Sequence, residues 1–185
     1  MKQGSIGLIS VVLGILIQTQ AGLAGTLVEF QGGIGVDPVS RVDGGGPANA
    51  VAVPNVVRGV NPGLQPWVIR KFEAKVKENG DIRAEGKGLV QAGGNAIGTP
   101  GPVVMVGATL FCGNPGAGVE FVQGAATAHS SGAVPLRPDG DFKIKNELTP
   151  SPPDPCTNPV LLIRAGGAAG RWLAAGIPKL EEEDD

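Results

Sequence analysis

Polar and apolar residues alternate most regularly between residues 71 and 88, and this alternation predicts a β-hairpin. Apolar or small residues occupy every second position, and mostly charged residues occupy the positions between them. A period of two places the two sets on opposite faces of a strand. Asn79 and Gly80, a pair typical of turns, separate the two alternating runs. The segment therefore predicts two antiparallel strands with one buried and one wet face.

The turn of this hairpin decides which residues face each other. A two-residue turn would set Val76 opposite Arg83 and mix the two faces. A three-residue loop over residues 78–80 pairs Val76 with Ile82 and keeps the apolar residues together. That loop requires Gly80 to adopt the left-handed conformation. We expect the three-residue loop.

Further short strands are predicted along the chain, and no segment has a convincing helical pattern. Residues 102–112 and 160–163 are near-continuous apolar runs, typical of buried strands. Weaker or alternating strands are expected at residues 26–30, 119–128, 134–136, 142–148 and 171–175. Counted with the hairpin, these make eight or nine strands. The expected fold is all-β, an antiparallel β-sandwich with Greek-key or immunoglobulin-like connections; the alternative is a closed β-barrel.

Residues 31–66 depart from this pattern, because glycine, proline and asparagine recur throughout. Such a stretch favours an extended segment outside the core, with some of its valines docking a short part of it. The chain is therefore expected to divide into a signal peptide at 1–24, a first strand and Gly/Pro-rich flexible arm at 25–66, a β-sandwich core at 67–178 and an acidic disordered tail at 179–185.

The first 24 residues indicate export. Lys2 gives a positive start, residues 6–17 form an apolar run, and small residues precede Gly25. This is the pattern of a secretory signal peptide cleaved before Gly25. The run is shorter than the roughly 20 apolar residues of a membrane-spanning helix. We expect a protein that is secreted or held in the cell envelope, periplasmic or extracellular, with no integral membrane segment after processing.

Charge and cysteine content narrow the function further. The formal net charge is −2 and residues 181–185 are all acidic, so the chain offers no basic field for nucleic acid. Cys112 and Cys156 are the only cysteines, and in an oxidising compartment they predict one disulfide. Their spacing matches no redox motif, and with a single histidine they match no metal-binding pattern. No metal or cofactor is expected.

Candidate catalytic residues are few. His129 is the only histidine, and neighbouring Ser130 and Ser131 do not by themselves provide a Ser-His-acid geometry. We expect His129 on the surface or in a loop, and no catalytic residue. If the protein is an enzyme, the candidates are His129 and Glu120, the latter in an apolar context. Core packing is the better account of the few aromatic residues, and Trp67, which follows Pro66 at a strand start, is the candidate for ligand contact if its indole is exposed.

Several stretches carry a resemblance to known proteins. They are GATLFC at 107–112, PLRPDGDF at 135–142, PCTNPVLLIR at 155–164 and GRWLAAG at 170–176. With the hairpin at 67–90, this pattern resembles a group of small exported bacterial proteins of unassigned function. The resemblance implies an exported β protein and supplies no active site to carry over.

The sequence therefore predicts a non-enzymatic exported β-sandwich that acts as an envelope or extracellular binding or structural module. The alternative is a secreted hydrolase with an atypical carboxylate or Ser/His site. The expected partner is a protein or a glycan, or a second copy of the chain that pairs through residues 31–66.

Overall fold

The computed structural model describes residues 24–44, 49–113 and 127–179, which form thirteen β-strands and no α-helix. The expected signal peptide up to residue 23, the acidic tail from residue 180 and the stretch 119–126 of one expected strand lie outside these ranges. No helix able to cross a membrane is found among the described residues.

Nine strands form one antiparallel sheet in the order β10-β8-β12-β13-β1-β5-β6-β11, with β9 beside β10 on the free edge of β8. Their bounds are β1 Thr26–Gly35, β5 Lys71–Lys77, β6 Asp81–Lys87, β8 Met105–Cys112, β9 Thr127–Ser130, β10 Val134–Pro135, β11 Phe142–Glu147, β12 Val160–Ala165 and β13 Trp172–Pro178. Two further pairs are β2 Val39–Asp43 with β3 Val51–Pro54, and β4 Trp67–Val68 with β7 Val90–Gln91.

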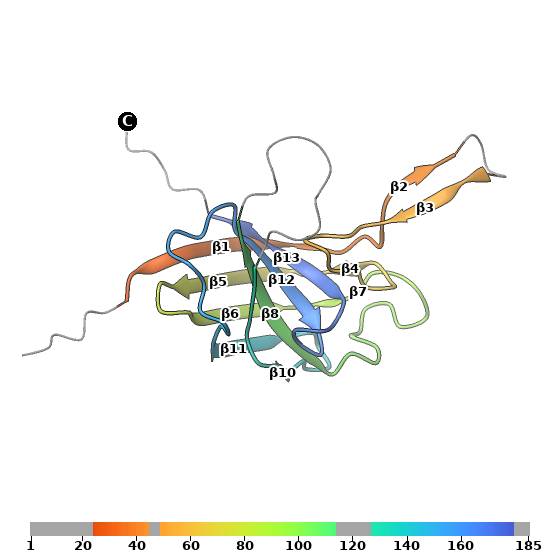
Figure 1. Ribbon diagram of the computed structural model, residues 1–185. Coiled ribbons are helices and arrows are strands. Elements are labelled where there is room, and N and C mark those ends of the chain that lie inside the picture. The colour runs from red at the N-terminus through yellow and green to blue at the C-terminus, as the bar shows by residue number, and fades with distance from the viewer. Residues whose placement is uncertain (1–23, 45–48, 114–126, 180–185) are drawn as a thin grey trace, which may run out of the picture.

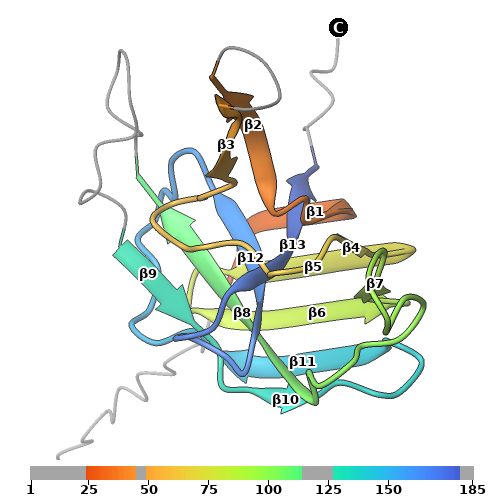
Figure 2. The ribbon, with the colours of Figure 1, turned by 90° about the vertical axis from the view of Figure 1, so that its right-hand side faces the viewer.

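The main sheet curves until its two ends meet. β11, at one end, contacts both β8 and β10 at the other, and β10 and β11 lie side by side at the bottom of the molecule (Figure 2). The expected all-β antiparallel fold is confirmed. Its continuous sheet has the nearly closed form of the barrel alternative.

Alternation places one set of side chains inside this barrel. Residues buried to 2% exposure or less include Phe30, Val76, Ile82, Leu110, Ile144, Leu161, Ile163 and Leu173. The rings of Phe72 and Phe142 lie 6.4 Å apart, and each belongs to a residue directly opposite Gly86. A glycine is needed between them, because a Cβ at Gly86 would collide with the Phe142 ring.

The register predicted for the hairpin is confirmed. Val76 faces Ile82, and Ala74 faces Ala84, as the three-residue loop requires. Gly80 has a φ of +89°, the left-handed conformation that favours glycine.

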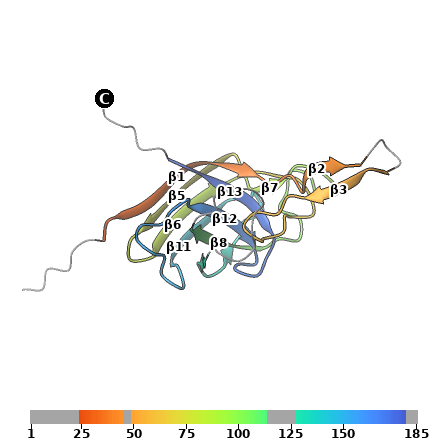
Figure 3. The same ribbon diagram turned by 45° about the horizontal axis from the view of Figure 1, so that its top comes forward.

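Residues 25–66 include parts of the barrel and a projection from it. β1 lies between β13 and β5, so the first strand belongs to the main sheet. β2 and β3 form a two-stranded ribbon that extends away from the barrel (Figures 1 and 3). Residues 55–63 then return along β13: the Trp172 Nε1–H donates to the Asn55 carbonyl at 2.9 Å, and Gly63 N–H donates to the Trp172 carbonyl at 2.8 Å. We call residues 55–63 the strap.

The predicted disulfide is present. Cys112 at the end of β8 is bonded to Cys156 in the loop that leads into β12. The two strands are hydrogen-bonded neighbours, with Phe111 opposite Val160. The bridge therefore fixes the entry of the chain into a central strand.

Candidate functional site

The candidate residues chosen from the sequence do not meet in one site. Trp67 is only 4% exposed and belongs to the core, so the alternative of an exposed indole is wrong. Its backbone N–H donates to the Val36 carbonyl at 2.8 Å, which draws β4 against the end of β1. The side chain forms one wall of an apolar groove that also includes Leu64 and Val103. Glu120 lies outside the described residues.

His129 is also buried, with 2% exposure, so its expected surface or loop position is wrong. It lies in β9 opposite Leu110, and the segment at Thr149 and Pro150 packs beside that strand. The Nδ1 atom lies 2.8 Å from the Pro150 carbonyl oxygen, so Nδ1 carries the proton in this bond. The Nε2 atom is buried and has no partner among the described residues.

The neighbouring serines are engaged elsewhere. The Ser130 hydroxyl lies 3.0 Å from the Thr109 hydroxyl. The Ser131 hydroxyl donates to the Gly132 carbonyl and accepts from the Ala108 N–H, both at 2.9 Å. The described structure therefore does not bring a serine hydroxyl to the His129 ring. Within the same residues, no group of three His, Cys, Asp or Glu side chains could hold a metal ion.

The outer side of β1, β5, β6 and β11 carries a dense set of charged side chains, which we call the charged face. Its basic residues outnumber its acidic ones. The basic residues are Lys71, Lys75, Lys77, Arg83, Lys87, Lys143, Lys145 and Lys179, and the acidic residues are Glu29, Glu73, Asp81, Glu85 and Glu147.

Strand register sorts these charges into rows across the sheet. Lys75 lies opposite Arg83, and Arg83 lies opposite Lys145, so three cations occupy adjacent strands at one level. We call these three residues the cation row. Like charges directly opposite each other on neighbouring strands destabilise a sheet. The row therefore departs from what stability alone would favour.

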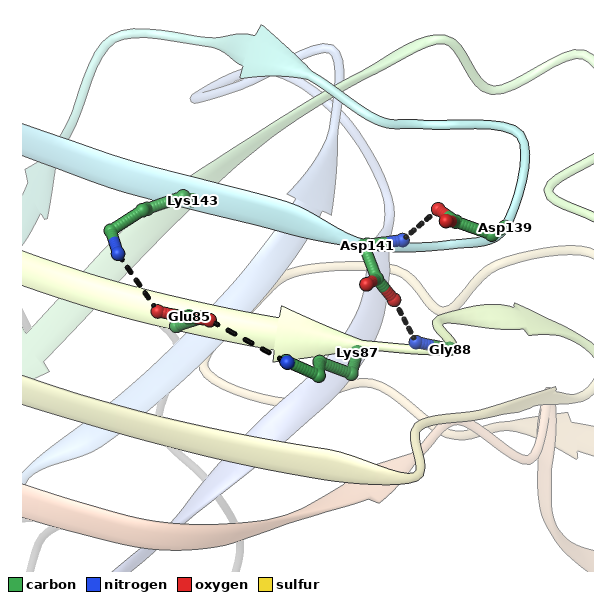
Figure 4. A network of polar contacts seen from close by, with 6 residues as sticks. All are labelled: Glu85, Lys87, Gly88, Asp139, Asp141 and Lys143. Carbon is green, nitrogen blue, oxygen red and sulfur yellow. Dashed lines mark hydrogen bonds and ion pairs between the residues drawn. The ribbon is translucent and has the colours of Figure 1, made fainter.

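Two carboxylates neutralise part of the positive charge on the charged face. Lys75 Nζ donates to Glu29 Oε1 at 2.8 Å, and Lys179 Nζ lies 3.5 Å from the other oxygen of Glu29. Lys143 Nζ donates to Glu85 Oε2 at 3.0 Å, and Lys87 Nζ lies 4.0 Å from Glu85 Oε1 (Figure 4).

These contacts shift both carboxyl groups in the same direction. The hydrogen bond and charge of Lys75 lower the pKa of Glu29 below its ordinary value. The hydrogen bond and charge of Lys143 lower the pKa of Glu85 in the same way. Both groups therefore remain ionised at neutral pH and hold their lysines in place.

Arg83 and Lys145 receive no such direct contact, although the charge of Lys145 also contributes to the lowered pKa of Glu85. Neither forms an ion pair or a side-chain hydrogen bond with any of the described residues. Both line two neighbouring surface grooves, and Lys75 lines the same two. One groove continues toward Glu29 and Glu85, and the other continues toward Asp81. The cation row is therefore open to solvent between them.

The turn before β11 holds that strand at this level. The Asp141 carboxylate accepts a hydrogen bond from Gly88 N–H at 3.0 Å, and Asp139 accepts one from Asp141 N–H at 3.1 Å (Figure 4). Gly140 has a φ of +79°, and a Cβ at this position would collide with the backbone of Leu89. This turn therefore joins β11 to the end of β6.

Sequence reasoning identified the alternating lysines and glutamates but missed the cation row. The signal was present in the even spacing of Lys143 and Lys145 and in that of Lys75 and Lys77. The missing information was the pairing of β11 with β6, strands that are separated by more than 50 residues.

Comparison with known proteins adds no family to this description. No protein-family model, no curated protein and no solved structure matches the chain. The resemblance to small exported bacterial proteins stays an expectation from the sequence.

Proposed function

We propose that this chain is an exported, non-enzymatic binding module of the cell envelope or extracellular space, and that its charged face binds an acidic glycan. The observation that carries the proposal is the cation row. Two of its three members, Arg83 and Lys145, form no ion pair or side-chain hydrogen bond with a carboxylate of the described residues, although the charge of Lys145 acts on Glu85 from a distance. An anionic ligand would supply the missing compensation.

The geometry of the row suits an extended polyanion. Neighbouring strands lie about 4.8 Å apart, so Lys75, Arg83 and Lys145 present cations at intervals of about 5 Å. This interval is comparable to the length of one sugar unit in an extended polysaccharide. A chain of uronic acids carries one carboxylate on each sugar unit, so a bound segment would bring several anions to the row. Arg83, at its centre, can hold one carboxylate through two parallel hydrogen bonds.

Two features support the exported setting. The signal-peptide pattern directs the chain out of the cytoplasm. The bond between Cys112 and Cys156 persists in oxidising compartments and is rare in reducing ones. Acidic glycans occur outside the cytoplasm, so the setting and the ligand class agree.

Binding fits the described residues better than hydrolysis does. The His129 ring is buried against Pro150, and the hydroxyls of Ser130 and Ser131 are bonded to other groups. A general base must reach the proton it removes. His129 has no such access in the described structure.

The test is a titration of the processed, disulfide-bonded chain with hexagalacturonate, and with a neutral glucan hexamer as the comparison ligand. The row variant combines Arg83→Gln with Lys145→Gln. The matched control combines Lys71→Gln with Lys87→Gln, which removes the same charge from the same face at two residues that line neither groove of the row. We expect hexagalacturonate to bind, with an affinity that falls as salt rises. The Kd for hexagalacturonate should rise about tenfold or more in the row variant and about twofold or less in the control.

Two outcomes would contradict the proposal. Equal losses in both double variants would mean that only the overall charge attracts the glycan. The absence of saturable binding at low salt, or equal binding of the neutral hexamer, would remove the acidic glycan as the ligand.

A second function is favoured by the ribbon of β2 and β3. Two apolar side chains of this ribbon are largely exposed to solvent: Val42 is 61% exposed and Val51 is 63% exposed. A two-stranded ribbon is marginally stable by itself in water, and its outer edges can accept another strand. The ribbon would then join copies of the chain into an assembly.

A further inference from the structure

Arg164 is the one buried residue among the described Lys, Arg, Asp and Glu residues, with 9% of its surface exposed. It lies in β12, and its Nε–H donates to the Gly170 carbonyl at 2.8 Å. No carboxylate of the described residues forms an ion pair with it, and the two terminal nitrogens of its guanidinium have no hydrogen-bond partner there.

A buried charge without a partner is unusual. Lys, Arg, Asp and Glu are almost never fully buried unless they are paired. Among the described residues only His129 Nε2 is a fully buried side-chain atom without a partner, so solvent reaches the unpartnered terminal nitrogens of Arg164. Burial lowers the pKa of the Arg164 guanidinium, and no neighbouring charge opposes that shift. The group nevertheless stays cationic at neutral pH, since an arginine begins from a very high value.

The guanidinium opens into a small pocket. The pocket has a volume of about 300 Å³ and lies between the strap and the turn after β12. Its lining residues are Gly59, Val60, Asn61, Arg164, Ala169, Gly170 and Arg171. Small side chains and exposed backbone dominate this list, so the two arginines are the chief sources of charge and hydrogen-bond donors.

Two consecutive residues, Arg171 just before β13 and Trp172 at its start, hold the two walls of the pocket. Trp172 N–H donates to the Asn61 carbonyl at 3.0 Å, which fixes the strap. The turn opposite is closed by the Ala165 N–H, which donates to the Arg171 carbonyl at 3.0 Å. Gly59 has a φ of +75°, and nothing lies near the position that its Cβ would take. The pocket is therefore part of the folded framework and is open at the strap.

Arg171 brings a second guanidinium to this pocket. One of its terminal nitrogens donates to the Pro62 carbonyl at 2.9 Å, which anchors the side chain beside the strap. Arg171 forms no ion pair with any of the described residues. Two cations without carboxylates thus share one small polar pocket.

We propose that this pocket binds a compact, doubly charged oxyanion, a phosphate or a sulfate, either free or as the terminal group of an ester. The planar guanidinium of Arg164 offers its free edge to two oxygens of such a group, and Arg171 offers donors at the rim. The site lies on the strap side of β12, on different strands from the charged face, and is independent of glycan binding there.

The test follows the Arg164 Nε–H by NMR in the processed, disulfide-bonded chain. Inorganic phosphate, sulfate and glucose 6-phosphate are each titrated at constant ionic strength maintained with sodium chloride. The signal is assigned by its absence in Arg164→Gln. We expect a saturable shift, a Kd about tenfold weaker in Arg171→Gln, and an unchanged Kd in the control Arg137→Gln, whose side chain is exposed on a turn.

Every outcome bears on the proposal. Binding of phosphate or sulfate alone identifies a free anion as the ligand, and binding of the ester as well identifies an esterified group; both support the pocket. If Arg164→Gln fails to fold, the site is tested by two other measurements. These are the saturable shift in the unaltered chain and the Kd of the Arg171→Gln variant. No saturation up to about 10 mM of any probe, or equal affinities in the Arg171→Gln and Arg137→Gln variants, would overturn the site.

Discussion

Gly86 of β6 lies directly opposite Phe142 of β11, and the Phe142 ring occupies the space into which a side chain at Gly86 would project. The Phe142 ring thus packs at the junction of β6 and β11, the two strands that carry Arg83 and Lys145. It makes the register of the cation row depend on packing inside the barrel.

We therefore expect Gly86→Ala to destabilise the fold by about 1–3 kcal/mol, because the added methyl group must displace a buried ring. Urea denaturation of the disulfide-bonded chain measures this change. Gly132→Ala is the matched control, since its Cβ would meet its nearest neighbour at an ordinary 3.4 Å. Equal stabilities of the two variants would show that the ring can move aside.

Removal of the disulfide should cost about 4 kcal/mol of stability in the chain-entropy model, because the bridge closes a loop with a sequence separation of 44 residues. Replacement of Cys112 and Cys156 by serine, followed by chemical denaturation, measures the loss. The native protein should also have a mass two hydrogens below that of its reduced form. Two thiols that alkylate freely in the folded protein would contradict the bridge.

The charged face should lose stabilisation in acid. A carboxyl whose pKa is lower in the folded than in the unfolded chain stabilises the fold above its unfolded pKa, and this contribution disappears as the pH falls through the folded pKa. The pKa values of Glu29 and Glu85 both lie below the ordinary 4.5. We expect a modest, salt-sensitive loss of stability from these groups below that pH.

NMR titration of the Glu29 and Glu85 carboxyl carbons checks this prediction directly. Lys75→Gln should raise the pKa of Glu29, and Lys143→Gln should raise that of Glu85, toward the ordinary value. Lys71→Gln serves as the control and should leave both unchanged. If the pKa values of Glu29 and Glu85 do not change when their lysines are substituted, the ion pairs do not persist in solution.

If the ribbon joins copies of the chain, the processed protein should associate in a concentration-dependent manner. Sedimentation velocity should show this association, and Val42→Lys combined with Val51→Lys should abolish it by placing charges on the ribbon. Ile97→Lys combined with Val104→Lys changes two equally exposed apolar residues elsewhere and should have no effect. A monomer at all concentrations, or assembly that survives the ribbon variant, would argue against this function.

Export should leave a protein that begins at Gly25. N-terminal sequencing of material secreted by a host that recognises the signal peptide tests the cleavage position. Retention of residues 6–17 in the exported form would contradict the signal-peptide interpretation.

Local patterns in the sequence were sufficient for the hairpin and for the fold class. Period-two alternation and the left-handed Gly80 determine the pairing of Val76 with Ile82, because a turn and its flanking strands act over a few residues. The sequence contains only two cysteines and predicts an oxidising compartment, which together made the disulfide between Cys112 and Cys156 predictable as well.

Tertiary structure alone decided where the polar side chains lie relative to one another. Lys145 faces Arg83 only because β11 pairs with β6. His129 is buried because the segment at Thr149 covers β9. Arg164 is buried because the strap, about a hundred residues earlier in the chain, returns over β12 and β13. Such pairings depend on which apolar faces can be buried together across the whole chain, and a local pattern specifies the face of a strand but not its neighbour.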